Sequence, residues 1–362
     1  MSVKKYFFVG NDDSKSGVGR FVWNSFIKTT EENNYKTVVK VQVKSNFSRK
    51  IIDYFNFNLR ILFLALNYSK SIIVHPQSIG FFQSSLIILF SKKTFYFTAD
   101  SSYFCLRSYN FNPKNKLECV KCLKGIKFKD NECKPFPYNS KLIWIKFFYY
   151  VVEKFKTKIV FLVQNQKQLE LIKLRYGEIN YHITSMNPGD ILENKFKNSI
   201  NSLELLPKNK KNILFHASNH LEKGYGFMID FAKKNKIFNV IIPSIKPENS
   251  LSIPNLFYIP CSWESGLLDL IIKCDIVMCP SIWSAPIEGA LLKSLYWNGV
   301  VAVHKTDFAF SNEIYEKILH IDDSTSEFEI LNFISKITKD DKESIKKFVL
   351  KKLNDFDLSI IK

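Results

Sequence analysis

The sequence predicts an α/β protein made of two doubly wound units, each built on a parallel sheet. Short apolar runs alternate with helix-like segments along the whole chain, which is the pattern of β–α–β units. The 362 residues, 46% of them hydrophobic, suffice for two domains with separate cores. A polar stretch containing a proline, near residues 198–212, interrupts the alternation and marks the expected junction.

The same alternation predicts the individual elements. In the first half we expect strands at 4–10, 37–43, 71–76, 93–99 and 158–163, and helices at 17–30, 47–66, 84–90, 140–155 and 166–177. In the second half we expect strands at 212–218, 238–244, 256–260, 275–280 and 300–304, and helices at 226–235, 265–274, 288–297 and 342–361. The predicted domains are 1–203, with a cysteine-rich insertion at 105–133, and 204–340, followed by a helix at 341–362 that docks on the first domain.

Charge and the absence of targeting segments limit the possible partners. No apolar run reaches the roughly 18 residues of a spanning helix, and the N-terminus resembles a first strand more than a signal peptide, so a cytosolic location is expected. The net charge of +18 favours an anionic partner: a nucleic acid, an acidic membrane or a phosphorylated small molecule, unless it only reflects lysine-rich coding bias. Since no nucleic-acid-binding motif occurs, no nucleic-acid partner is predicted.

Two strand–turn–helix segments in the second half are suited to anions. In "PSIWSAPIEGALLKSLYW" a helix is expected to begin near Pro286 to Glu288, and Gly289 lets a phosphate approach the amides of Gly289, Ala290 and Leu291. In "NILFHASNHLEKGYGF" Lys223 stands beside another helix start. Each segment alone is equally compatible with an ordinary crossover, but the pair suggests a diphosphate site.

These residues carry a resemblance. The "EKG" at 222–224 and the segment at 280–303 look like the nucleotide-sugar-binding half of a family 4 retaining glycosyltransferase with the GT-B fold, in which two Rossmann-like domains face a cleft. The first half agrees more loosely, through "SGVGRFVWNSF" and the "MNPGD" at 186–190. The resemblance implies a UDP- or GDP-sugar donor and a glycan or lipid-linked acceptor. The resemblance also implies a reaction that needs no divalent metal ion.

The resemblance also implies roles for residues. Donor binding falls on Gly17, Gly19, Ser218, Lys223, Gly224, Pro280, Ser281, Glu288, Gly289, Ala290, Leu291 and Lys293. The expected catalytic residues are Lys223, Glu288 and Asp100, which ends a strand in "FTADSSYF" and either orients a substrate or caps a helix.

Three departures from the family pattern weaken this prediction. Ser218 replaces an arginine, and the two characteristic glutamates fall on Ala285 and Lys293. Losing one preorganised hydrogen-bond donor typically lowers the rate by about 10²–10³, unless His216, Asn219 or His220 compensates. The alternative prediction is therefore a catalytically inactive GT-B homologue that acts as a binding protein. Asn298, where the family has Gly, is expected in a left-handed cap conformation.

Four cysteines and one aromatic helix suggest further properties. Cys105, Cys119, Cys122 and Cys133 fit a structural zinc site, with reduced thiols, disulfides or an iron–sulfur cluster as alternatives. Residues 144–158, "WIKFFYYVVEKFKTK", suit either an anionic membrane surface or a core helix. Together with the resemblance, which implies a glycosyltransferase of surface-polysaccharide biosynthesis, the aromatic helix and the positive charge predict a protein that is peripheral at the inner face of the membrane.

Overall fold

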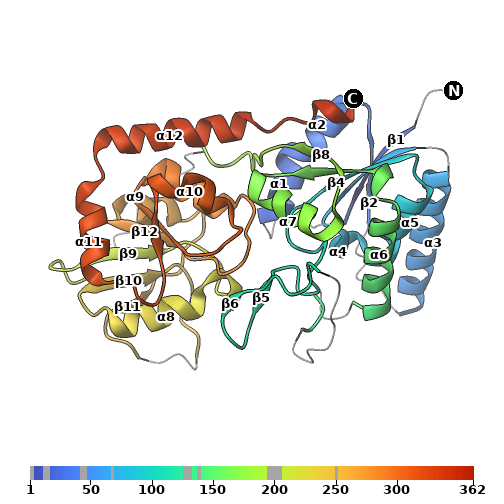
Figure 1. Ribbon diagram of the computed structural model, residues 1–362. Helices are drawn as coiled ribbons and strands as arrows, with labels where there is room; N and C mark the ends of the chain where they lie inside the picture. The colour runs from blue at the N-terminus through green and yellow to red at the C-terminus, as the bar shows by residue number, and fades with distance from the viewer. Residues whose placement is uncertain are drawn as a thin grey trace. The chain divides into compact units, whose positions relative to one another are not determined.

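A computed structural model describes residues 4–10, 17–40, 47–66, 69–124, 133–136, 140–193, 206–248 and 252–362. The chain divides into two compact units (Figure 1). The first unit comprises Met1–Asn110, Cys119–Gly189 and Asn354–Lys362, and the second comprises Phe111–Glu118 and Asp190–Leu353. The expected junction between residues 203 and 204 lies outside the described residues.

The first unit contains a six-stranded parallel sheet in the order β2-β1-β3-β4-β7-β8. Its strands are β1 (Lys5–Val9), β2 (Lys36–Val39), β3 (Lys70–Val74), β4 (Lys93–Phe97), β7 (Ile159–Val163) and β8 (Asn180–Ile183). All five residues of β7 are buried, as expected for an inner strand covered on both faces. The edge strand β8, which alternation did not predict, is mostly exposed.

Helices surround this sheet. They are α1 (Gly17–Phe21), the π-helix η1 (Val22–Phe26), α2 (Ile27–Glu32), α3 (Phe47–Leu66), α4 (Pro76–Ile79), α5 (Phe81–Phe90), α6 (Leu142–Lys154), η2 (Lys156–Lys158) and α7 (Gln166–Tyr176). Helix α5 packs against both α3 and α6 (Figure 1). Phe21 and Phe26 pack around Phe97 of β4 and Phe356 of the C-terminal segment, which anchors that segment in the first unit.

The second unit has its own six-stranded parallel sheet, in the order β11-β10-β9-β12-β13-β14. Its strands are β9 (Lys211–Phe215), β10 (Phe238–Ile242), β11 (Leu256–Tyr258), β12 (Ile276–Cys279), β13 (Val301–His304) and β14 (Leu319–Ile321). In chain order this is 3-2-1-4-5-6, so the direction of winding reverses between β9 and β12. Ligands of such sheets bind outside the carboxyl ends of the strands at this switch point.

The remaining elements complete the second unit and the C-terminus. They are the antiparallel hairpin of β5 (Phe111–Asn112) and β6 (Leu117–Glu118), η4 (Leu221–Lys223), α8 (Tyr225–Lys234), α9 (Leu267–Lys273), α10 (Gly289–Trp297), η5 (Phe310–Lys317), α11 (Glu327–Lys336), α12 (Lys339–Asn354) and η6 (Ser359–Ile361). Helix α11 begins with a capping box, in which Ser326 and Glu329 exchange hydrogen bonds. No helix in the described part of the chain is long and apolar enough to cross a membrane.

Candidate functional site

The two turns expected to bind an anion lie side by side at the switch point of the second unit. One follows β9 and the other follows β12, and these strands are paired. The Ile282 amide donates to the Glu222 carbonyl at 2.8 Å. Gly224 has a φ of +83°, and a Cβ there would lie 2.1 Å from the Pro280 carbonyl oxygen. Glycine is therefore required for this close approach of the turns.

An ion pair links the same turns. The Lys223 ammonium contacts the Glu288 carboxylate, which also accepts a hydrogen bond from the Ser281 hydroxyl at 3.1 Å. The ammonium lies 4.8 Å from the centre of the Trp283 ring. Because the Lys223 and Glu288 side chains are only 18% and 16% exposed, their charges are little screened by water. An anion that binds Lys223 must share it with Glu288.

The start of α10 offers backbone donors beside this ion pair. Helix geometry leaves the amides of Gly289, Ala290 and Leu291 without intrahelical acceptors, and the first intrahelical bond runs from Leu292 to the Glu288 carbonyl. Glu288 occupies the N-cap position but makes no capping hydrogen bond through its side chain. A cavity of about 10 Å³, room for roughly one water molecule, adjoins Ser281, Glu288 and Leu291.

A hydrogen bond between His216, directly after β9, and Ser294 links α10 to the sheet. The Ser294 hydroxyl donates to the Ala290 carbonyl, so it accepts from Nδ1 of the buried His216 at 2.8 Å. Ser218 and His220 are exposed in the turn after β9, and the Asn219 amide donates to Ser244. Of the three residues considered as substitutes for the missing arginine, His216 therefore contacts α10 directly.

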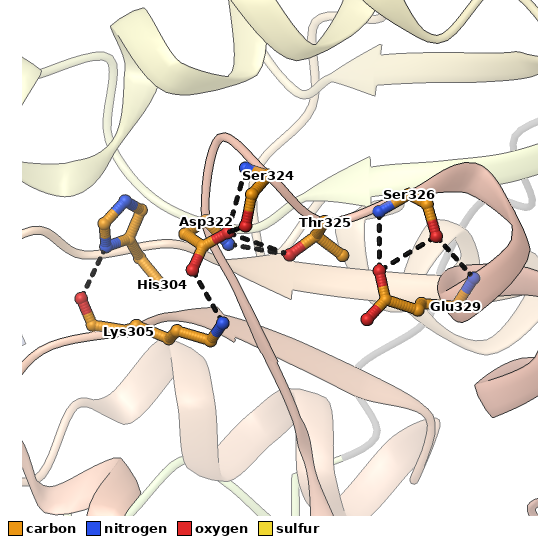
Figure 2. Close-up of polar contacts among 7 residues, drawn as sticks. All are labelled: His304, Lys305, Asp322, Ser324, Thr325, Ser326 and Glu329. Atoms are coloured by element: carbon orange, nitrogen blue, oxygen red, sulfur yellow. Dashed lines mark hydrogen bonds and ion pairs between the residues drawn. The ribbon is translucent and has the colours of Figure 1, made fainter.

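His304, at the end of β13, lines the same cavity. Its Nδ1 donates to the Lys305 carbonyl at 2.8 Å, and burial lowers its pKa, so the neutral ring has Nε2 as an acceptor. Figure 2 shows the adjoining corner, where the Lys305 ammonium donates to Asp322 at 2.6 Å. Hydrogen bonds from Lys305 and Ser324 hold the pKa of Asp322 below its usual range.

Lys293 does not have the environment expected of a donor contact. Its side chain is buried in α10, its ammonium lies 2.7 Å from the Asp190 carboxylate, and it stacks 3.8 Å from the centre of the Trp263 ring. Asp190 belongs to the same unit, and the neighbouring Ile191 carbonyl accepts a hydrogen bond from Trp297. The structure thus gives Lys293 an unexpected internal ion pair, and its contact with the nucleotide stays a prediction.

The predicted left-handed backbone conformation of Asn298, at the end of α10, was wrong. Asn298 has right-handed backbone angles, with φ −109° and ψ −48°, and the left-handed residue is Gly299, with φ +80°. The Asn298 amide instead donates to the carbonyls of Ile271 and Cys274 and so ties α10 to the end of α9. A glycine directly after Asn298 removes the need for a left-handed asparagine.

Sequence reasoning missed Glu118, which the β5–β6 hairpin brings to the turn after β12. Its carboxylate accepts hydrogen bonds from the Ser284 hydroxyl and, at 2.7 Å, from the Asp307 amide. Burial raises the pKa of Glu118, although these hydrogen bonds lower it in part. No local sequence signal indicates this contact, because Glu118 and Ser284 are 166 residues apart.

In the first unit, Asp100 lies in a buried polar cluster beyond the carboxyl ends of β3 and β4. His75 approaches it at 3.4 Å, and the Gln77 amide and the Ser102 backbone donate to it at 2.7 and 2.8 Å. Burial alone raises the pKa of Asp100, but the hydrogen bonds and charge of His75, with the bonds from Ser102, outweigh burial and lower it. The bond from Ser102 is a local turn contact, whereas His75, which the sequence did not indicate, reaches Asp100 from the end of the neighbouring strand β3.

The glycines assigned to the first unit occupy α1. Gly17 is the first residue of this helix and Gly19 the third. Residues 11–16, which precede this helix in the sequence, lie outside the described residues. The expected contact of Gly17 and Gly19 with donor phosphates therefore stays a prediction.

The zinc site is not supported. All four cysteines are described, and no group of three or more His, Cys, Asp or Glu side chains in the described part of the chain is arranged to hold a metal ion. Cys105 is buried, its Sγ donates to the Tyr109 carbonyl at 3.7 Å, and burial raises its pKa.

Comparison with known proteins gives matches in structure but none in sequence. No protein-family model and no curated protein sequence matches the chain. A UDP-forming α,α-trehalose-phosphate synthase from Burkholderia xenovorans has a TM-score of 0.58 at 9% identity, with 99% of this chain and 97% of that chain covered.

Two further solved structures are similar over nearly their whole length. WaaG, a glycosyltransferase involved in lipopolysaccharide biosynthesis, has a TM-score of 0.55 at 12% identity, covering 98% and 97% of the two chains. HepE from Anabaena in complex with UDP has a TM-score of 0.56 at 11% identity, covering 99% and 97%. With two six-stranded doubly wound sheets and these neighbours, the chain has the GT-B fold, as the sequence predicted.

Proposed function

We propose that the protein is a glycosyltransferase that moves a sugar from a UDP- or GDP-sugar to a glycan or lipid-linked acceptor in surface-polysaccharide biosynthesis. The observation that carries the proposal is the pairing of Lys223 with the uncapped start of α10 at the switch point. This arrangement offers one cation and three backbone donors to a diphosphate. The fold shared with WaaG, and with HepE in its UDP complex, supports the same class of donor.

The proposed reaction retains configuration at the anomeric carbon. The bond between this carbon and the β-phosphate oxygen breaks, and the acceptor oxygen forms its new bond on the same face. The acceptor proton passes to the departing phosphate oxygen, so the protein forms no covalent intermediate. Lys223 and the amides of Gly289, Ala290 and Leu291 stabilise the charge that develops on the leaving group.

Two carboxylates have supporting roles in this proposal. When a phosphate binds, Lys223 donates part of its hydrogen bonds to the phosphate instead of to Glu288. The Glu288 carboxylate then accepts a hydrogen bond from a hydroxyl group of the nucleotide sugar. Asp100, oriented by His75 and Gln77, binds a hydroxyl of the acceptor. No step in this scheme uses a metal ion.

The test is a ligand screen followed by a turnover assay. Thermal unfolding is measured with UDP, GDP, other nucleoside diphosphates and their sugar conjugates, since a ligand specific for the folded state raises the transition temperature. We expect one nucleotide to stabilise the protein and its sugar conjugate to be consumed. A protein that none of these compounds stabilises would refute the proposal.

Specific observations favour a catalytically inactive binding protein as the second candidate. Ser218 is exposed where the family has a cation, and Lys293, in place of a carboxylate, is engaged by Asp190. This candidate predicts that a nucleotide sugar binds but is neither hydrolysed nor transferred. Measuring nucleotide release from the bound sugar conjugate distinguishes the two.

A further inference from the structure

The outer face of α3 carries a row of large exposed apolar side chains. Phe55, Leu59 and Phe63 are spaced four residues apart, so they lie on one face of the helix. Their exposed fractions are 61%, 49% and 67%, whereas Ile61 of the same helix is fully buried. We call these three residues the α3 stripe. A contiguous exposed apolar surface of this kind typically marks an interaction site.

The first turn of α6 carries a second group of exposed apolar side chains in the same unit. Ile143 and Trp144 are 63% and 36% exposed, and Trp144 packs on Phe82 of α5 with ring centres 4.6 Å apart. Helix α5 contacts both α6 and α3 (Figure 1). Farther along α6, Phe148 and Tyr149 are fully buried. The aromatic residues in the middle of this helix are therefore core, and its exposed apolar residues lie mainly at its start.

The positive charge of the chain is concentrated in the same unit. The first unit contains 29 Lys and Arg against 13 Asp and Glu, a net charge of +16. The second unit contains 23 Lys and Arg against 21 Asp and Glu, a net charge of +2. Nearly all of the excess positive charge therefore belongs to the unit that carries the α3 stripe. In α3 itself, Arg60 is exposed.

We propose that the first unit docks on an anionic lipid bilayer through the α3 stripe and the first turn of α6. Aromatic and aliphatic side chains enter the boundary between headgroups and acyl chains, where tryptophan is favoured, while the net positive charge of the unit attracts acidic lipids. A second copy of the chain is a poorer occupant, because pairing two such faces brings together two units of +16. An anionic bilayer accommodates both the apolar row and the positive charge.

The test is flotation with vesicles of phosphatidylcholine alone and of phosphatidylcholine with phosphatidylglycerol. The unmodified chain is compared with the triple variant Phe55→Gln, Leu59→Gln, Phe63→Gln, which keeps good helix formers in α3. We expect flotation with the anionic vesicles, weakening as salt is added. Removing three inserted side chains should lower the partition coefficient by about 100-fold or more.

A matched control replaces exposed apolar side chains of the second unit by glutamine. The double variant Ile245→Gln, Phe328→Gln removes side chains that are 78% and 75% exposed on the second unit, and it should float like the unmodified chain. The proposal is overturned if the unmodified chain does not float, if it floats equally well with both kinds of vesicle, or if the triple variant floats as well as the control. A dimer in solution that the triple variant dissociates would assign the stripe to a second copy and would also overturn it.

Discussion

Replacing Lys223 by alanine perturbs the candidate donor site in two ways. It removes the cation beside the start of α10, and it leaves the Glu288 carboxylate, which Lys223 contacts, without that counter-charge. An incoming diphosphate then meets a negative charge where the unmodified protein presents a nearly neutral pair. We therefore expect a larger loss of affinity than from removing one hydrogen bond.

The size of the loss follows from the environment of the pair. One charge-assisted hydrogen bond contributes about 1.5–3 kcal/mol. A repulsion between Glu288 and a phosphate about 6 Å away adds up to about 3 kcal/mol at an effective dielectric constant of about 20, and the 16% exposure of Glu288 leaves much of this unscreened. Together these effects amount to about 1.5–6 kcal/mol, which weakens nucleoside diphosphate binding by about 10-fold to 10⁴-fold.

The carboxylate partner provides the opposite perturbation. Glu288→Gln releases the Lys223 ammonium from its ion pair, so inorganic pyrophosphate should bind more tightly than to the unmodified protein. If Glu288 also accepts a hydrogen bond from the ribose, a nucleoside diphosphate gains less than pyrophosphate does. The double variant Lys223→Ala, Glu288→Gln should bind more tightly than Lys223→Ala alone, because the two effects are coupled.

Isothermal titration calorimetry of the unmodified protein and the three variants, with pyrophosphate and with the nucleoside diphosphate, measures these affinities. The transition temperature of each variant, measured without ligand, controls for loss of folding. An unchanged dissociation constant in Lys223→Ala would refute the assignment of the diphosphate to this site. Equal affinities of Lys223→Ala and the double variant would show that Glu288 exerts no repulsion.

Three further predictions concern the second unit. Gly224→Ala, at φ +83°, should lower stability by at least about 1–2 kcal/mol and weaken nucleotide binding, whereas Gly226→Ala, inside α8 and facing only a side chain, should be neutral or stabilising in thermal unfolding. Lys293→Glu places a second carboxylate beside Asp190 and should lower the free energy of unfolding, measured with urea, by about 3–5 kcal/mol. The double variant Lys293→Met, Asp190→Leu should retain most of the stability of the unmodified protein. A Lys293→Glu protein of unchanged stability would contradict the ion pair. Because the folded-state pKa of Asp322 is depressed, its hydrogen bonds stabilise the fold above about pH 5, and this stabilisation is lost as the pH falls below about 4. Asp322→Asn should therefore abolish roughly 0.5 kcal/mol of the pH-dependent free energy of unfolding. An identical dependence of stability on pH in this variant would exclude the contribution.

Much of the fold could be predicted from local patterns in the sequence. The inner strands are short apolar runs buried on both faces, as β7 and β10 are, and such runs have few other stable environments. The turn glycine at 224 and the helix start near Glu288 are likewise local signals. The edge strands β8 and β14 were missed because they are short and mixed in polarity, and they become strands only by pairing with a sheet already formed.

The sequence by itself determined which turns could present amides and a cation to a diphosphate, because backbone geometry near a helix start depends on neighbouring residues. Only the tertiary structure decided which charges meet. The partner of Lys293 is 103 residues away, that of Lys223 is 65 residues away, and Glu118 reaches Ser284 across 166 residues. The energy of a buried charge depends on what surrounds it in space, and the spacing of residues along the chain carries almost no information about that.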